Sequence, residues 1–340
     1  MSLSKRLKGM IWDLAYLSGF LALLQGVRPG PVYKGLIFYY HRVHPNPGWD
    51  PVGVTISLSL FTRQMALIKK NFPVLSLSNF FDQLKKQTPS LEENPPIVIT
   101  FDDGYRDVWE YAWPVLRDFR ISPALFVCTD PLIRRTPLLW DLLAQAVQED
   151  KRKQIISSVS PLDRISPLET EEEKKIFVRE MNQHLLGKSG RKQRKAFGDL
   201  SGPMAERIIV HTAKLYLQPD HVKECLRAGI EIGGHTASHP YLTFLPRQEW
   251  DYEIRESKNE LEALLGTEVP FFSYPAGKWN EEVRKYVIST GYRGALATGK
   301  SVVPVSQRDF FSLPRISPEG VIAMGKFFAL VSGVKKEWFH

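Results

Sequence analysis

Residues 95–107 read PPIVITFDDGYRD, a short apolar run that ends abruptly in two neighbouring carboxylates and a glycine. An apolar run flanked by Pro and Gly is typical of a strand that is buried on both faces of a parallel sheet. In a barrel of such strands, residues at the carboxyl ends face the active site. Asp102 and Asp103 would repel each other there unless a cation lies between them or one of them keeps its proton. A helix N-cap requires a single Asp, so capping explains the pair less well.

The composition is that of a globular protein with a substantial core, since 43% of the 340 residues are hydrophobic and 24% are charged. The net charge of +8 favours an acidic partner surface, such as anionic lipid, a phosphate-bearing substrate or nucleic acid. We expect no nucleic-acid partner, because basic and aromatic residues do not interleave as they do in nucleic-acid modules. Cys128 and Cys225 lack the spacing of a metal motif or a disulfide framework, which fits a reducing compartment.

Residues 1–30 form a separate N-terminal segment in which basic residues precede an apolar run that is short for a membrane span. Asp13 and the lack of a small-residue cleavage site argue against a signal peptide. One interpretation is an amphipathic helix that lies on an anionic membrane, and the other is a helix packed on its own domain. The protein is expected to be cytoplasmic, and the first interpretation adds a peripheral position on the inner face of the cell membrane.

Strands and helices are expected to alternate from residue 31 to residue 340, which is the pattern of a parallel α/β sheet or barrel. A helix is expected over 61–71, capped by Ser59, and another over about 248–265 that stops at Gly266. The expected strands are the apolar runs 36–40, 97–101, 124–128, 229–234, 270–274, 294–297 and 312–316.

The regular alternation is interrupted at about residues 131–220, which are rich in charged residues. This composition predicts a mostly helical insertion with a flexible turn at 187–190. Its charge runs indicate either an ordinary solvated face or a lid or membrane-facing surface.

Polar side chains stand at or just beyond the ends of the predicted strands, so in a barrel they would meet at one mouth. His235 and His239 are four residues apart, a spacing that lets both imidazoles reach one metal ion. Two imidazoles and a carboxylate make a three-ligand site with an open position, as in hydrolytic zinc enzymes. The strand-end residues are His41, Asp102, Asp103, His235, Tyr274 and Arg315.

The runs TFDDG at 100–104 and HTASH at 235–239 resemble the first two motifs of the polysaccharide deacetylase (NodB-homology) family of carbohydrate esterases. The resemblance covers roughly residues 31–130 and 220–320. It implies a distorted (β/α) barrel, here of about seven parallel strands. It also implies metal-dependent removal of acetyl groups from N-acetylated sugars.

Carried over to this sequence, the resemblance implies that Asp103, His235 and His239 bind a divalent metal, with Zn²⁺ expected. It implies that Asp102 is the general base. The carbonyl of the acetamide would become an oxyanion during attack, and the backbone N–H of Ala276 is a candidate donor to it.

Two departures from the common family pattern affect the remaining roles. The third motif reads SYPAG at 273–277 and lacks the arginine that usually orients the base, so Arg315 is a candidate replacement. The late Leu-x-His motif that carries the general acid is also absent. The run YYHRV at 39–43 instead resembles the early histidine motif of the poly-N-acetylglucosamine deacetylase branch, which implies that His41 is the acid, with His44 as a weaker alternative.

These features predict an N-deacetylase that acts on an N-acetylated polysaccharide or lipid-linked glycan during cell-surface polysaccharide assembly. A hydrolase of a small N-acetylated molecule is an alternative. A catalytically inactive carbohydrate-binding protein is another, which the missing third-motif arginine and late histidine would favour. The retention of both aspartates and both histidines argues against inactivity.

Overall fold

The computed structural model describes residues 13–14, 33–86, 95–149, 154–157, 164–299, 303–304, 309–319, 321 and 323–331. The expectations for residues 1–30, including the membrane-associated helix, therefore lie outside the described residues apart from Asp13 and Leu14. None of the helices described combines the length and the apolarity needed to cross a membrane.

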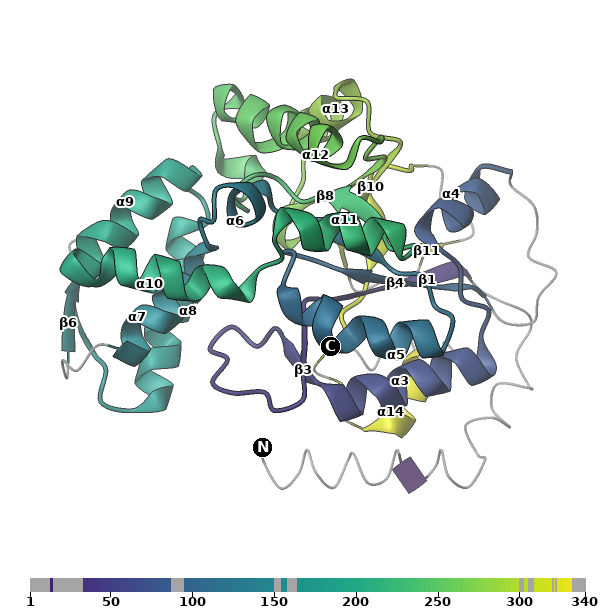
Figure 1. Ribbon diagram of the computed structural model, residues 1–340, viewed down its shortest axis with the longest axis horizontal. Coiled ribbons are helices and arrows are strands. Elements are labelled where there is room, and N and C mark those ends of the chain that lie inside the picture. Colours follow the sequence, from purple (N-terminus) through teal and green to yellow (C-terminus); the bar gives the residue numbers. More distant parts are fainter. Residues whose placement is uncertain are drawn as a thin grey trace.

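Seven parallel strands form a nearly closed barrel, and Figure 1 shows several of them side by side with helices around them. The barrel closes where Ile316 meets the first strand: the Tyr39 N–H donates to the Ile316 carbonyl at 3.1 Å, and the Ile316 N–H donates to the Ile37 carbonyl at 3.0 Å. This confirms the expected distorted barrel. In spatial order the strands are β1 (Tyr33–Tyr40), β4 (Ile97–Phe101), β5 (Ala124–Val127), β8 (Glu231–Gly234), β9 (Phe271–Ser273), β10 (Gly294–Thr298) and β12 (Leu313–Arg315), with β11 (Val303–Pro304) antiparallel to β1.

The amino-terminal end of the barrel is filled by helix α4 (Leu77–Lys86), whose Phe80 and Phe81 are buried with the inward-facing strand residues. Gly35 and Gly294 make room for these two rings, because a Cβ on either glycine would lie within 2.4 Å of a ring carbon. The interior is therefore packed from one end, and polar side chains have space only at the opposite, carboxyl-terminal end.

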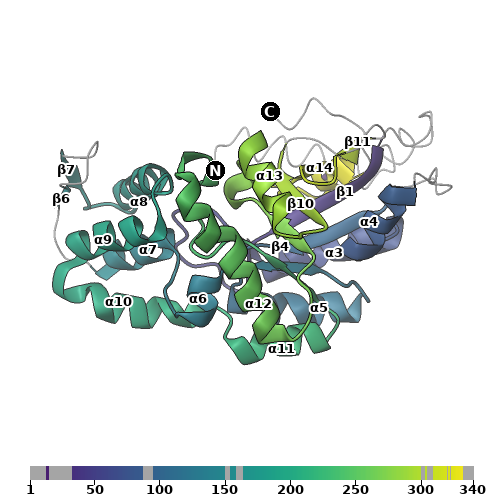
Figure 2. The same cartoon turned by 90° about the horizontal axis from the view of Figure 1, so that it is seen from above.

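Helices surround the barrel and bury its outer surface in the main hydrophobic core (Figures 1 and 2). They are α3 (Leu58–Asn71), α5 (Trp113–Asp118), α11 (Pro219–Arg227), α12 (Ser257–Leu265), α13 (Glu281–Ser289) and α14 (Met324–Val331). Shorter elements between them are β2 (Arg42–His44), β3 (Thr55–Ser57), the π-helices η1 (Val108–Ala112) and η6 (Asp251–Glu256), and the 3₁₀ turns η4 (Leu242–Phe244), η5 (Arg247–Glu249) and η7 (Pro275–Gly277).

The ends of two helices test the expected boundaries. The assignment of Ser59 as the first cap is wrong: α3 begins at Leu58, and Ser57, which has extended backbone angles, accepts a hydrogen bond from the Leu60 N–H. Ser59 is already in the first turn, where its backbone is helical. Gly266 ends α12 with a φ of 68°, as expected for a glycine after a helix.

The described part of residues 131–220 is helical apart from a hairpin and has its own hydrophobic cluster, which includes Leu143, Val178, Phe197 and Ile208. In Figure 1 these helices lie to the left of the barrel. The elements are α6 (Thr129–Ile133), α7 (Leu139–Glu149), the strands β6 (Gln154–Ser157) and β7 (Arg164–Pro167), α8 (Glu171–Leu185), α9 (Gly190–Ser201), η2 (Gly202–Met204), α10 (Ala205–Thr212) and η3 (Ala213–Leu215).

Candidate active site

The two aspartates directly follow β4 at the carboxyl-terminal mouth of the barrel. The Asp102 N–H continues the strand ladder by donating to the Tyr40 carbonyl at 2.9 Å. The chain then turns sharply, because Asp103 and Gly104 have φ values of 72° and 81°. Position 104 requires glycine both for this φ and because a Cβ would lie 3.1 Å from a methyl group of Val127. Both carboxylates are buried.

The loop after β8 carries both histidines and has a strained backbone, with φ values of 66° at Thr236 and 59° at His239. The Thr236 hydroxyl accepts from the His239 N–H at 2.9 Å. A fully buried carboxylate, Glu253 of η6, accepts from the N–H groups of Ala237 and Ser238 at 3.1 and 2.9 Å, and from the Ser238 hydroxyl at 2.6 Å. Burial raises the pKa of Glu253 to about 7, and the hydrogen bonds from Ser238 oppose the rise. Glu253 therefore fixes the shape of the histidine loop.

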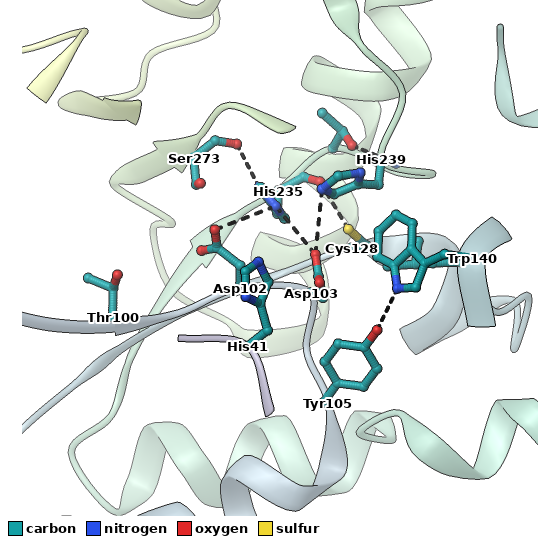
Figure 3. Close-up of polar contacts among 12 residues, drawn as sticks. His41, Thr100, Asp102, Asp103, Tyr105, Cys128, Trp140, His235, His239 and Ser273 are labelled. Carbon is teal, nitrogen blue, oxygen red and sulfur yellow. Dashed lines mark hydrogen bonds and ion pairs between the residues drawn. The ribbon is translucent and has the colours of Figure 1, made fainter. Parts of the chain in front are cut away.

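Three ligand-type side chains converge in this mouth, as Figure 3 shows. The Nε2 atoms of His235 and His239 lie 3.5 and 3.6 Å from Asp103 Oδ1. Their ligand atoms all lie within 4.8 Å of one another, and all three side chains are buried. No other group of three or more such side chains, within the described ranges, has this geometry.

The donor set fits a divalent metal ion. Asp103 Oδ1 is buried and has no hydrogen-bond partner among the described residues, as expected for an atom that faces a cation. His235 Nδ1 lies 2.7 Å from the Ser273 carbonyl, so Nδ1 carries the proton and Nε2 presents its lone pair. Burial lowers the pKa of His239 to about 4, which keeps this imidazole neutral and able to bind metal.

Asp102 is held by the guanidinium of Arg315, which is fully buried at the end of β12. Two parallel hydrogen bonds join Nη1 to Oδ1 at 2.8 Å and Nη2 to Oδ2 at 2.7 Å. Burial alone would raise the pKa of Asp102, but Arg315 and His235 outweigh it and hold the pKa well below its usual range. The carboxylate is therefore ionised and oriented. The structure thus places Arg315 where an orienting group for Asp102 would have to lie.

The small side chain of Ser273 allows an arginine from β12 to reach this position. It stands in the third motif where the common pattern has its arginine, and its hydroxyl accepts from Arg315 Nη2 at 2.6 Å. Thr100 in β4 accepts from Nη1 at 3.1 Å. The small side chain leaves room for a guanidinium that arrives from a later strand. Sequence reasoning identified Arg315 but gave Ser273 and Thr100 no role.

His41 lies directly after β1, beside Asp102 in Figure 3, and is paired with Glu319. Its Nδ1 is 3.2 Å from both carboxylate oxygens, and its backbone N–H donates to Oε1 at 2.7 Å. Burial lowers the pKa of His41, but Glu319 and, to a smaller extent, the two aspartates outweigh it and raise the pKa to about 10. Glu319 follows the last strand in a loop without any motif, so nothing in the sequence singles it out.

Three other predicted residues are placed differently. His44 is turned toward its own loop, with Nδ1 2.8 Å from the Asn46 carbonyl. Tyr274 donates its hydroxyl to the Phe311 carbonyl at 3.0 Å, so it does not join the cluster. Ala276 lies in the turn η7 with a φ of 51°, and its carbonyl accepts from the Thr298 hydroxyl at 2.9 Å. Its N–H as an oxyanion donor stays a prediction.

The insertion packs a side chain against the candidate metal-ligand cluster. Trp140 of α7 meets the edge of the His239 ring, with centroids 4.7 Å apart, and its indole N–H donates to the Tyr105 hydroxyl at 2.8 Å. Tyr105 in turn donates to Asp141 at 2.8 Å. The His239 ring therefore has both Trp140 and His235 as ring neighbours, and the network holds Trp140 in place. The sequence gave no signal for Trp140, because only the fold brings α7 to the mouth.

Comparisons with known proteins show similarities in both sequence and fold. Residues 183–295, which include the HTASH run, match the family model described as polysaccharide deacetylase. A curated relative, the "Putative polysaccharide deacetylase YxkH" of Bacillus subtilis (strain 168), is 28% identical over 122 residues, or 36% of this chain. The chain spans only 43% of the length of that relative.

Solved structures share the fold at low sequence identity. The Streptococcus pyogenes deacetylase PplD in complex with acetate is 16% identical, with a TM-score of 0.52 over 84% of this chain and 93% of that chain. IcaB from Ammonifex degensii is also 16% identical, with a TM-score of 0.53 over 87% of this chain and 97% of that chain.

Proposed function

We propose that the chain is a metal-dependent hydrolase that removes N-acetyl groups from N-acetylhexosamine units, and the match of residues 183–295 to the polysaccharide deacetylase family model supports this. The substrate is a polysaccharide or lipid-linked glycan of cell-surface polysaccharide assembly. One observation carries this proposal: a three-ligand site, an ionised and oriented carboxylate and a cationic histidine share one mouth of the barrel. Metal-assisted amide hydrolysis by water uses these three elements together: a Lewis acid, a general base and a general acid.

The metal site is formed by Asp103, His235 and His239, and its donor set suits Zn²⁺. When bound there, the metal supplies a Lewis acid for the acetamide carbonyl and makes water more acidic. The Ser273 carbonyl keeps His235 in the tautomer that binds through Nε2. The turn at 275–277 follows β9 at the same mouth, where the Ala276 N–H would donate to the developing oxyanion.

Asp102 acts as the general base and accepts a proton from the attacking water. The Arg315 pair keeps this carboxylate ionised across the neutral range and fixes its direction. A carboxylate with a lowered pKa is a weak base, so the water must be made more acidic before the transfer is favourable. The metal site and Asp102 are therefore required together.

His41 acts as the general acid for the leaving amine. Its Nδ1 faces Glu319, so the transferable proton is the one on Nε2. The Glu319 charge keeps the imidazole protonated, which is the form that can donate. Without this proton the sugar nitrogen would have to leave as an amide anion.

Release of acetate from N-acetylhexosamine glycans tests the proposal. We expect the Zn²⁺-loaded protein to release acetate and the chelated protein to release none, as measured by an enzymatic acetate assay. Acetate release only from small N-acetylated molecules would change the substrate class. Binding of glycans by metal-loaded protein without any acetate release would indicate an inactive carbohydrate-binding protein.

The substitution His41→Ala should separate acid catalysis from a structural role. We expect amide cleavage to fall by about 10²-fold or more, because an amine leaves poorly without a proton. Hydrolysis of an activated aryl acetate should change only a few-fold, because a phenolate leaves unaided. The measurement is kcat/KM on both substrates, with His44→Ala as the control. Equal losses on amide and ester would assign His41 to structure.

Glu319→Gln should shift the pH profile without removing the acid. Glu319 raises the pKa of His41, so loss of its charge lowers that pKa. The protonated imidazole is the active form, and activity is lost as pH rises through its pKa. We therefore expect the alkaline limb of kcat/KM to move down by about one pH unit. Glu281→Gln, an exposed residue of α13, is the matched control. An unmoved alkaline limb would exclude Glu319 as the group that sets the His41 pKa.

A further inference from the structure

An exposed group of aromatic and basic side chains lies beside the candidate active site on two of the loops that form it. We call it the aromatic–lysine patch, and it consists of Tyr241, Phe244 and Lys278. Tyr241 is two residues beyond the metal-ligand candidate His239, and Lys278 is two residues beyond Ala276. Two residues span at most about 7 Å between Cα atoms, so the backbones of Tyr241 and Lys278 lie close to the candidate site, and Phe244 lies beside both of their side chains.

Phe244 is 64% exposed, more than any other aromatic side chain whose exposure the structure describes. Its ring centroid is 6.2 Å from that of Tyr241. Full burial of a phenylalanine side chain would stabilise the fold by ~1.5–3 kcal/mol, and Phe244 does not make this contribution in the free protein. An exposed ring beside a second aromatic ring offers an apolar surface on which a ligand can stack.

The support under Phe244 is rigid. The neighbouring Leu242 is fully buried, and its carbonyl accepts from the indole N–H of Trp250 at 3.1 Å. The insertion reaches the same place: the Tyr241 N–H donates to the Leu186 carbonyl at 2.6 Å, and a Cβ on Gly187 would lie 3.7 Å from Phe244. The exposure of Phe244 is therefore built into a fixed surface.

Lys278 adds hydrogen-bond donors to this surface. Its Nζ lies 4.5 Å from the Tyr241 ring centroid and 5.7 Å from that of Phe244. Within the described parts of the chain, Lys278 has no carboxylate partner at ion-pair distance. The ammonium is held over two rings, and hydrogens that do not face the rings are free to donate.

We propose that the aromatic–lysine patch binds the sugar unit next to the one that is deacetylated. A pyranose has an apolar C–H face that stacks on Phe244 and Tyr241, and hydroxyl oxygens that accept from Lys278. Three side chains are too few for a stable protein interface, which needs about 1,000 Å² or more, but they match one sugar. The inference rests on the proposed function and adds that the enzyme recognises a chain rather than a single sugar.

The test compares binding of an N-acetylglucosamine monomer with binding of β-1,4- and β-1,6-linked tetramers to the full-length, Zn²⁺-loaded protein by calorimetry. All proteins carry Asp102→Asn, which is expected to keep the metal but not to consume the glycan during the titration. We expect the protein with the wild-type patch to bind one tetramer more tightly than the monomer. Phe244→Ala should lower this tetramer-to-monomer affinity ratio about tenfold, and Phe244→Tyr should preserve it. Lys278→Gln should also lower it.

Two exposed residues outside the patch provide matched controls. Val210→Ala on α10 and Lys70→Ala on α3 should keep the wild-type ratio. A wild-type ratio near one for both tetramers, or a Phe244→Ala variant with the wild-type ratio, would overturn the inference. If glycans release acetate and either of these results is obtained, the subsite inference is refuted while the proposed deacetylase function stands. The two proposals can therefore be tested independently.

Discussion

Loss of any one metal-ligand candidate is expected to abolish metal retention and acetate release. Asp103, His235 and His239 supply all three protein ligands of the site, so each substitution to Ala leaves only two. Loss of a residue that only hydrogen-bonds to a metal ligand typically weakens metal affinity about 10–100-fold. Loss of a ligand itself should therefore weaken metal affinity by more than about 100-fold. The measurement is the metal content after dialysis, combined with acetate release.

The backbone complicates one of these variants and suggests a better one. Asp103 has a φ of 72°, where Ala is strained, so misfolding of Asp103→Ala would also remove the metal. Asp103→Asn avoids this problem, because Asn tolerates the left-handed region and its amide is a poor ligand. His221→Ala, on the helix α11, is the matched control and should retain metal. Near-stoichiometric metal in Asp103→Asn, His235→Ala and His239→Ala would refute the site.

The barrel was predictable because its signals are local. Each strand of the barrel lies within, or overlaps, an apolar run of the sequence, and the two aspartates and the HTASH run each follow a strand directly. The order of the strands then brings distant segments to one mouth without further information. Arg315 was identifiable for the same reason, since it stands at the carboxyl end of a predicted strand, as the other site residues do.

The groups that orient the site were not predictable, because they depend on contacts between distant segments. Glu319 meets His41 across 278 positions, from a loop with no pattern of its own. Glu253 belongs to a charged stretch of helix, where periodicity assigns a glutamate to solvent, yet it is fully buried under the histidine loop. Trp140 comes from the insertion, and the composition of the insertion does not predict that it packs against the barrel.

The wrong helix cap has a different cause. Ser57 precedes α3 and Ser59 lies in its first turn. Both are serines, and serine is a favoured N-cap residue. Only the backbone angles decide between them, and those depend on the strand β3, which ends at Ser57. Such boundaries are set by the neighbouring element rather than by the cap residue.

Asp102→Asn is expected to lower turnover by ~10²–10⁴-fold on both the amide and the activated ester, while metal stays bound. The amide has nearly the same shape but cannot accept the proton of the attacking water. Both substrates require that transfer, whereas only the amide requires the acid, so this variant should differ from His41→Ala. A variant that keeps most of its activity would show that Asp102 is not the base.

The buried ion pair allows the base role to be separated from stability. Asp102→Asn leaves the fully buried Arg315 without its countercharge, and breaking such a pair costs ~3–5 kcal/mol. The double variant Asp102→Asn/Arg315→Met removes both charges and should recover much of the free energy of unfolding, measured by denaturant titration. Its activity should stay as low as that of Asp102→Asn, because the base is still absent. Recovery of activity together with stability would mean that the pair serves the fold alone, and that another group accepts the proton.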